Sequence, residues 1–310
     1  MTSSSPDTLL TRYMPPPIPA GIMAMLCYSG TFIVVRDFAG VIPPAAITLI
    51  RCLIALLILY PMCRQGLRAQ WPLIRLHWRF LALQGVLIVV FGNGLMFVGL
   101  QFTTAINGSL INSAEPVVIV LMAWLMFRDR LTLVQWMGVV VSALGVVYLI
   151  GRGELSVLQK FDLNIGDVFV FVSIICWSVY AVLMRRVPPE LDRLNFLFCI
   201  LAFGAITVFP FWVLEHLYYL PTPFTWTTLG VTGGMALFTS ILALLWWNRA
   251  VEGLGASRAG LLLHLIPVFT VILAIWLLGE ETFLFHAIGI GLIGLGIYLT
   301  TILKSKPADD

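Results

Sequence analysis

The chain has 310 residues, of which 60% are hydrophobic and only 11% are charged. Soluble domains carry about 25% charged residues, so this composition excludes a soluble enzyme, a disordered protein and a nucleic-acid-binding protein. The formal net charge is +3, which leaves no basic patch large enough to bind a polyanion. The composition therefore predicts a membrane protein.

Ten apolar runs follow one another along the chain with short polar connections between them. A hydrocarbon core about 30 Å thick takes about 20 apolar residues per helix, and the runs are close to that length. They are continuously apolar instead of alternating, which excludes the strands of a β-barrel. We therefore expect an all-α integral membrane protein with ten transmembrane helices. The expected spans are residues 19–36, 45–63, 80–100, 105–126, 132–150, 167–185, 194–214, 227–247, 257–278 and 284–303.

The distribution of Lys and Arg sets the predicted orientation, because basic residues concentrate in short cytoplasmic loops. With the N-terminus in the cytoplasm, fourteen of the 18 basic residues lie on the cytoplasmic side. Three lie outside, namely Arg36, Arg152 and Lys160, and Arg51 lies inside a span. We expect a multi-pass protein of the cell inner (plasma) membrane with both termini cytoplasmic. Its expected partners are the lipid bilayer and a small-molecule substrate, without nucleic acid, and the chain is expected to be a monomer or a homodimer.

Residues 1–20 are polar and rich in Ser and Pro, and no small-residue cleavage site closes an apolar stretch there. We expect a flexible lead and not a cleaved signal peptide. The five cysteines form no C-x-x-C pair. Four of them lie in apolar runs, where thiols behave as small buried hydrophobes. Neither a metal site nor a cofactor is expected, because no ligand spacing is present.

An internal repeat relates the two halves of the chain. Pro116 and Pro267 lie 151 residues apart, and a valine follows each of them. The same offset aligns Ala105 with Ala256, Leu110 with Leu261, Ala123 with Ala274, Asp129 with Glu280, Gly138 with Gly289 and Gly145 with Gly296. Upstream, an offset of 149 aligns Cys27-Tyr28-Ser29 with Cys176-Trp177-Ser178, and Tyr60-Pro61 with Phe209-Pro210.

Each copy of the repeat holds five spans, so the second copy must insert upside down. The expected fold is therefore two inverted five-helix repeats. This pattern is typical of many secondary transporters, whose substrate site lies near the midplane between the halves. The predicted segments are a flexible lead (1–18), the first repeat (19–150), an outer connecting loop (151–166), the second repeat (167–303) and a cytoplasmic tail (304–310).

The chain resembles the EamA group of the drug/metabolite transporter superfamily over roughly residues 20–303. The resemblance rests on the stretch from Ala114-Glu115-Pro116 to Thr132, on Leu278-Gly279-Glu280 with the glycines from 289 to 296, and on Arg51 at the start of the second span. It implies ten helices in two EamA repeats, an inner-membrane location and the movement of small organic solutes. The turn at 127–130, Phe-Arg-Asp-Arg, departs from the family, which commonly has Gly and then Glu there.

Glu115 is the sharpest candidate for a functional residue, because it lies near the middle of the fourth predicted span. A carboxylate at the bilayer centre is costly, so it should face protein or water, and such residues are functional by default. On a helix Asn112 and Gly108 share a face with Glu115, and this face suits an ammonium group or a proton. The alternative is a structural hydrogen bond or ion pair to a neighbouring helix.

Three basic side chains are further candidates. Arg51 either binds a substrate carboxylate as a bidentate fork, or snorkels to the outer headgroups, or pairs with Asp37 or Glu115. His264, one turn before the proline of the ninth span, either relays protons or makes a hydrogen bond between helices. Arg258, at the start of that span, is expected to be a topology anchor.

Aromatic and polar side chains form a second candidate set. Tyr28 and Trp177 are equivalent in the repeat, and Tyr180 lies one turn further on. Matching faces of the third and eighth spans carry Asn93, Met96, Phe97, Trp246, Trp247 and Asn248. If both copies point these faces inward, they line a cavity for an amphipathic solute or a cation, through cation–π contact. Otherwise these residues belong to the interfacial aromatic belt.

The predicted function is that of a secondary transporter, an exporter or exchanger of small metabolites that works by alternating access around a central cavity. Amino acids and related amines or amphipathic compounds are the expected substrates, and protons are a candidate coupling ion. The alternative is an uptake permease for an anionic organic solute, with Arg51 and Arg258 as carboxylate or phosphate clamps. A non-transporting membrane enzyme or scramblase is a remote alternative, because no clustered catalytic groups or metal-ligand spacing are present.

Overall fold

The computed structural model describes residues 15–128, 132–150, 153, 164–254 and 262–299. In these ranges all regular elements are helices, and no strand occurs. Seven helices are long and apolar enough to cross a membrane. Three shorter apolar helices accompany them, over Leu133–Tyr148, Leu265–Leu278 and Leu284–Gly296. The predicted all-helical membrane fold is confirmed, and the ten-span inverted arrangement stays a prediction.

The helices fall into two series, one in each half of the chain. The first series is α2 (Pro17–Asp37), α3 (Pro44–Ala69), α4 (Trp71–Leu76), α5 (Trp78–Gly85), η1 (Val86–Gly94), α6 (Leu95–Phe102), α7 (Ala105–Asn112), α8 (Glu115–Phe127) and α9 (Leu133–Ile150). The second series is α11 (Ile165–Leu183), η2 (Met184–Arg186), α12 (Arg193–Tyr218), α13 (Trp226–Met235), η3 (Ala236–Leu242), α14 (Ala243–Leu254), α16 (Leu265–Leu273), η4 (Ala274–Leu278) and α17 (Leu284–Ile297). Here η2 is a 3₁₀ turn, η1 and η3 are π-helical segments inside longer helices, and η4 is a π-helical segment that ends the helix begun by α16.

Local sequence explains where the helices begin and end. Proline occupies the first turn of both α2 and α3, where its missing N–H would have no partner in any case. The side chains of Thr104, Asn164, Asp192 and Thr225 accept hydrogen bonds from backbone N–H groups at the starts of α7, α11, α12 and α13. These are N-caps, which satisfy the free donors of the first helical turn.

The ends of α8 and η4 are stopped in the same way. Arg128 follows α8 in the left-handed conformation with φ 57°, and Gly279 follows η4 with φ 65°. The two residues are 151 positions apart, which is the offset of the sequence repeat. A left-handed residue after a helix lets the last carbonyls find donors and turns the chain away. Gly279 adopts this backbone conformation with little conformational free energy, whereas the Cβ of Arg128 raises the free energy of the same conformation.

The predicted uninterrupted helix over 105–126 is broken in the middle. A turn at Ser113 and Ala114 separates α7 from α8. Pro116, in the first turn of α8, has no N–H to donate to the carbonyl of Asn112, so the hydrogen-bond ladder lapses there. The structure has a second turn of this kind at residues 263–264, directly before α16 and its Pro267.

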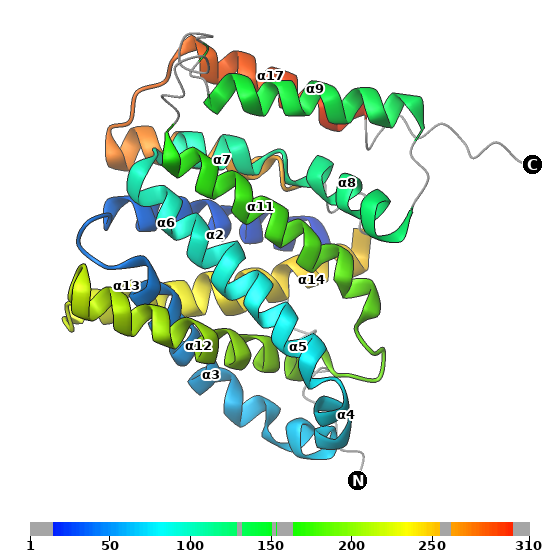
Figure 1. Cartoon of the computed structure of the whole chain (residues 1–310), viewed down its shortest axis with the longest axis vertical. Coiled ribbons are helices and arrows are strands. Elements are labelled where there is room, and N and C mark those ends of the chain that lie inside the picture. The colour runs from blue at the N-terminus through cyan, green and yellow to red at the C-terminus, as the bar shows by residue number, and fades with distance from the viewer. Residues whose placement is uncertain (1–14, 129–131, 151–152, 154–163, 255–261, 300–310) are drawn as a thin grey trace, which may run out of the picture.

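Helices of the first series pack against helices of the second series throughout the molecule. The main pairs are α3 with α12, α2 with α14 and α16, α6 with α11, and α9 with α17. In Figure 1 α9 and α17 lie side by side at the top of the stack, and α3 and α12 lie at the bottom. The pairs match across the repeat, in which α2 of the first half is equivalent to α11 of the second. Helix α2 contacts α14 and α16 of the second half, and α11 contacts α6, α7 and α8 of the first half. Two buried clusters result, one around α2, α6 and α7 and one around α3 and α12.

Small residues permit the closest of these contacts. A Cβ on Gly296 of α17 would collide with the backbone of Gly138 and with Ser142 on α9, and a Cβ on Gly145 would collide with α17 at Ile293. Close helix packing through small residues is typical of membrane bundles. Large apolar side chains on the outer surfaces of the bundle stay exposed, Leu57 and Trp226 among them. The outside of the molecule is therefore apolar, as lipid contact requires.

Candidate functional site

Glu115 begins α8 directly after the turn that interrupts the fourth helix. Its carboxylate is half-buried and makes a side-chain hydrogen bond with Asn112, the last residue of α7. Asn112 and Glu115 were expected on one continuous helix face, whereas the structure brings them together across the turn between α7 and α8. Gly108 was expected on the same face, but the position that a Cβ on Gly108 would occupy lies against Leu100 and Phe32.

Tyr28 links this carboxylate to two other helices. It lies on α2 within electrostatic range of Tyr180 on α11, Glu115 on α8 and Arg51 on α3. Tyr180 is buried, and its ring meets that of Trp177 edge to face, with the centroids 5.4 Å apart at 80°. Trp177 in turn lies against Gly92 of η1, where a Cβ would collide with its indole ring. Four elements thus converge on Tyr28 and its neighbours.

Arg51 supplies the cation of the same region. Its side chain is only 5% exposed, and its guanidinium carbon lies over the ring of Phe97, 5.0 Å from the centroid. The Nε atom has no hydrogen-bond partner. Among the described residues no carboxylate lies within 4.0 Å of the guanidinium, so the ion pairs considered with Asp37 and Glu115 do not form. A buried cation that lacks an anionic partner is expensive, and the ring of Phe97 offsets that cost only in part.

These contacts define a central cluster made of Tyr28, Arg51, Phe97, Asn112, Glu115, Trp177 and Tyr180. Of the helices that carry it, α2, α6, α7, α8 and α11 lie between the top and bottom pairs in Figure 1, and α3, which carries Arg51, lies below them. The cluster offers one carboxylate, one guanidinium and two tyrosines within an apolar surround. Such a set can hold a solute that carries both an ammonium and a carboxylate group, or either of them.

Four predicted residues lie outside the central cluster. Asn93 is half-buried in η1, and Trp246 and Trp247 are half-buried on α14, where they pack against the core that includes α2. His264 is half-buried at the turn before α16. In the part of the chain that the structure describes, none of the four has a hydrogen bond, ion pair or ring contact to the cluster. Arg258, Asp129 and the side chain of Asn248 lie outside the described residues.

Sequence reasoning missed two carboxylates that join the halves. Glu280 accepts hydrogen bonds from the backbone N–H groups of Ala105 at 2.8 Å and Ile106 at 3.0 Å, and so caps the start of α7. Glu215 at the end of α12 accepts from the N–H of Ala45 at 2.9 Å, in the first turn of α3. The repeat had drawn attention to Glu280 as the equivalent of Asp129, but only the fold shows which helix end it reaches.

A histidine makes a third contact between the halves. The ring of His286 accepts a hydrogen bond at Nδ1 from the N–H of Phe283, 3.0 Å away. Its Nε2 therefore carries the proton and donates to Oδ1 of Asn107, 2.9 Å away, if the ring is neutral. Among the described residues no group of three His, Cys, Asp or Glu side chains could hold a metal ion. This contact therefore joins α17 to α7 and does not belong to a metal site.

Comparison with known proteins places the chain among transporters. The model of the EamA-like transporter family matches it twice, over residues 16–151 and over residues 164–302. The transporter YyaM of Bacillus subtilis, whose function is uncharacterized, is 32% identical over 215 residues, which are 68% of this chain and 69% of that protein. An uncharacterized transporter of Archaeoglobus fulgidus is 28% identical over 286 residues, which are 90% of this chain and 95% of that protein. A solved crystal structure with 20% identity covers 93% of this chain and 96% of its own, with a TM-score of 0.58, and so shares the fold.

Proposed function

The chain belongs to the EamA-like transporter family, and from that premise we propose that it is a secondary transporter, an exporter or exchanger of small metabolites. It is a multi-pass membrane protein, and its relatives carry the name of transporters. Transport would proceed by alternating access, in which the two halves rock about a site between them. The central cluster is that site.

One observation carries the proposal: a half-buried carboxylate, Glu115, begins a helix at a break inside a membrane-spanning segment. Discontinuous helices at such a depth form the substrate sites of many transporters, because they present polar groups where a continuous helix has none. An ionisable residue within a span is functional by default. Asn112 makes a hydrogen bond with this carboxylate, and the helix that carries it, α8, packs against α11 of the other half.

The chemistry of the cluster favours amino acids and related amines as substrates. Glu115 is the partner for a substrate ammonium group, and the unpaired guanidinium of Arg51 is the partner for a substrate carboxylate. Tyr28, Trp177 and Tyr180 supply faces for an apolar or aromatic side chain. Protons are a candidate coupling ion, because a proton on Glu115 would compete with a bound ammonium group.

We propose the inverted arrangement of two five-helix repeats as the architecture of this transporter. The double match of the family model and the matched helix pairs in the two halves support it. The proposed units are residues 19–150 and 167–303, in the inner membrane with both termini cytoplasmic, as the excess of Lys and Arg on that side favours. Asp129, the repeat equivalent of Glu280, lies outside the described residues.

The experiment that tests the proposal compares three solutes that differ by one charged group: phenylalanine, phenethylamine and 3-phenylpropionate. The purified protein is reconstituted into vesicles, and counterflow of each solute is measured for the wild type, Glu115→Gln and Arg51→Gln. We expect the wild type to carry phenylalanine. Glu115→Gln should lose phenylalanine and phenethylamine, whereas Arg51→Gln should lose phenylalanine and keep any binding of phenethylamine, which has no carboxylate. Each loss should be about tenfold or more in apparent affinity, because each variant leaves one charge of a desolvated pair unmatched.

Glu281→Gln, which removes an exposed carboxylate next to Glu280, serves as the control and should give the same result as the wild type with each of the three solutes. Detergent-solubilised samples of each variant should bind the retained solutes with a rise in the unfolding midpoint, since a ligand that binds only the folded state stabilises it. Absence of flux for these solutes and for a broad panel of metabolites would overturn the transporter proposal.

The second candidate function is an uptake permease for an anionic organic solute, which the unpaired guanidinium of Arg51 favours. The same experiment separates the two candidates. Transport of 3-phenylpropionate by the wild type, lost in Arg51→Gln and retained in Glu115→Gln, would support the permease. Binding of phenethylamine that depends on Glu115 would contradict it.

A further inference from the structure

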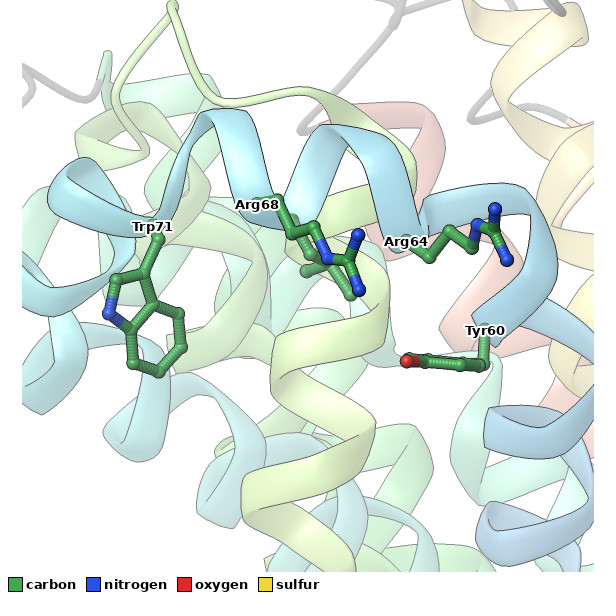
Figure 2. Close-up of a pocket in the computed structure, with 5 residues that line it drawn as sticks. Tyr60, Arg64, Arg68 and Trp71 are labelled. Atoms are coloured by element: carbon green, nitrogen blue, oxygen red, sulfur yellow. The ribbon is translucent and has the colours of Figure 1, made fainter.

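A hollow of about 300 Å³ lies on the outer surface of α3, near its C-terminal end and away from the central cluster. Its lining consists of Tyr60, Arg64, Leu67, Arg68 and Trp71. Figure 2 shows the two arginine side chains above the ring of Tyr60, with the tyrosine hydroxyl directed towards Arg68. Residues 60, 64 and 68 follow at intervals of four, so they share one stripe of the helix.

The length of α3 places these guanidinium groups at the level of lipid headgroups. The helix has 26 residues and is therefore about 39 Å long. Arg64 and Arg68 lie about 30 Å and 36 Å from its first residue along the axis, whereas the hydrocarbon core is about 30 Å thick. Tyr60 and Trp71 are both exposed. Aromatic side chains of this kind collect at the boundary between hydrocarbon and water.

No protein carboxylate neutralises the two arginines. The sequence has no acidic residue from 38 to 114. Among the described residues, no carboxylate lies within 4.0 Å of Arg64 or Arg68. Asp192, on the neighbouring α12, uses its carboxylate to accept the N–H of Leu194 at 3.2 Å. Two exposed cations thus line one hollow, and no carboxylate in the described part of the chain forms an ion pair with either of them.

Contacts with α12 hold the hollow in shape. The amide nitrogen of Gln70 donates to the carbonyl of Glu190 at 2.8 Å, and its oxygen accepts from the Asp192 N–H and from the Asn195 amide at 3.1 and 2.9 Å. The ring of Tyr60 packs against Phe198 with the centroids 6.2 Å apart. The end of α3 and the start of α4 are therefore fixed, and the arginine pair is presented from a rigid base.

We propose that this hollow binds the phosphate of an anionic phospholipid. Guanidinium groups match phosphate oxygens in a bidentate way. The hydroxyl of Tyr60 adds a donor, and Leu67 and Trp71 pack against the glycerol and upper acyl chain. Arg79, in contrast, lies over the ring of its neighbour Trp78 at 5.6 Å and does not line this hollow. The site is separate from the central cluster, so it does not depend on the transported solute.

The test uses the full-length protein purified in detergent and titrated with phosphatidylglycerol or with phosphatidylcholine of the same acyl chains. Native mass spectrometry counts the bound lipids, and the unfolding midpoint reports stabilisation. We expect phosphatidylglycerol to bind and to raise the midpoint, and phosphatidylcholine to do neither. The double variant Arg64→Gln/Arg68→Gln should lose about tenfold in apparent affinity for phosphatidylglycerol, since each basic residue near a lipid surface adds to binding.

The matched control is Arg75→Gln/Arg79→Gln, which removes the same charge from the adjacent segment and should keep the affinity. Arg64→Lys/Arg68→Lys keeps both positive charges but loses the bidentate guanidinium groups, and should bind phosphatidylglycerol with intermediate affinity. A folding defect in the glutamine variant would be recognised because the lysine variant retains binding. Equal losses in the two glutamine variants would overturn the proposal in favour of non-specific attraction. Equal stabilisation by glycerol 3-phosphate would overturn it in favour of a site for a soluble phosphate.

Discussion

The role of Arg51 depends on the side chains that surround its guanidinium group. The sequence places it inside a predicted span, where a bound substrate, a headgroup or an ion pair would each explain it. The structure buries it to 5% exposure over Phe97 and gives its Nε no partner. An unpaired guanidinium at this depth is costly, so a solute carboxylate that reaches it gains an interaction that water no longer supplies.

At Arg128 we expect a substitution to stabilise the protein. Arg128 is exposed and left-handed with φ 57°, whereas its repeat equivalent is Gly279. A left-handed conformation costs a residue with a Cβ about 1–2 kcal/mol, and glycine loses part of that gain to its freer unfolded state. Arg128→Gly should therefore stabilise the fold by about 0.5–1 kcal/mol, read as a higher unfolding midpoint in detergent. Arg128→Ala, which keeps the Cβ, should give no such gain, and an equal gain in both variants would contradict the argument.

Part of the central cluster could be predicted residue by residue. The spacing of Asn112 and Glu115 places them on one helix face, Tyr28 and Trp177 are equivalent in the repeat, and Tyr180 lies one turn after Trp177. The role of Phe97 as the ring beneath Arg51 could not be predicted in this way. It depends on how far α6 is rotated against α3, and that rotation is set by packing across several helices.

At the scale of helices, the start of α7 depends on a carboxylate from the other half. Both oxygens of Glu280 accept backbone N–H groups there. A cap of this kind contributes about 1–2 kcal/mol, aided by the positive end of the helix dipole. We expect Glu280→Ala to lower the unfolding midpoint of the purified protein, and Glu280→Gln, which keeps one acceptor, to lower it less.

The control for that prediction is Glu281→Ala, which removes the adjacent exposed carboxylate and should leave the midpoint within the error of the measurement. If the two alanine variants were equally stable, the cap would contribute nothing to the fold. A loss in both would point to the charge of the loop and not to the hydrogen bonds.

The starts of the first eight predicted spans were predictable to within about two residues, because apolar runs of that length have few alternatives in a bilayer, whereas α3 and α14 continue to Ala69 and Leu254, beyond the predicted ends at 63 and 247. The internal detail of the helices was not. The break before Glu115 follows from Pro116, but its turn geometry at Ser113 and Ala114 also depends on what packs there. In η1 and η3 the backbone hydrogen bonds span five residues instead of four. No sequence pattern in Val86–Gly94 or Ala236–Leu242 predicts this π-helical geometry.

At the scale of the whole molecule, the two halves are interleaved and not merely joined. Each of α2, α3, α6 and α9 has its main partner in the second half. The sequence repeat predicted two copies of one unit, and the family model matches the chain twice, over residues 16–151 and 164–302. It did not predict which helices would meet, because contacts between copies are set by shape and not by the register within each copy.

This interleaving predicts that the halves reassemble when the chain is cut between residues 150 and 164. We expect each fragment alone to fail to accumulate, and the co-expressed pair to co-purify through a tag on one of them and to retain ligand-induced stabilisation. Gly296→Leu in the second fragment should abolish co-purification, because its side chain would collide with Gly138 and Ser142 of α9. Stable accumulation of a lone fragment would contradict the prediction.

The cap on α7 has a consequence for the time course of synthesis. Ala105 and its acceptor Glu280 are 175 residues apart. A ribosome that adds about 5–20 residues per second needs about 10–35 seconds to make the second after the first. Throughout that interval the start of α7 has no glutamate and Asn107 has no His286, and α3 lacks α12 until residue 218 has been made. The first half therefore spends that time at the insertion machinery or in lipid without the hydrogen-bond partners of its polar groups. A translational pause that lengthens the interval also lengthens the time in which the first half is exposed to proteolysis.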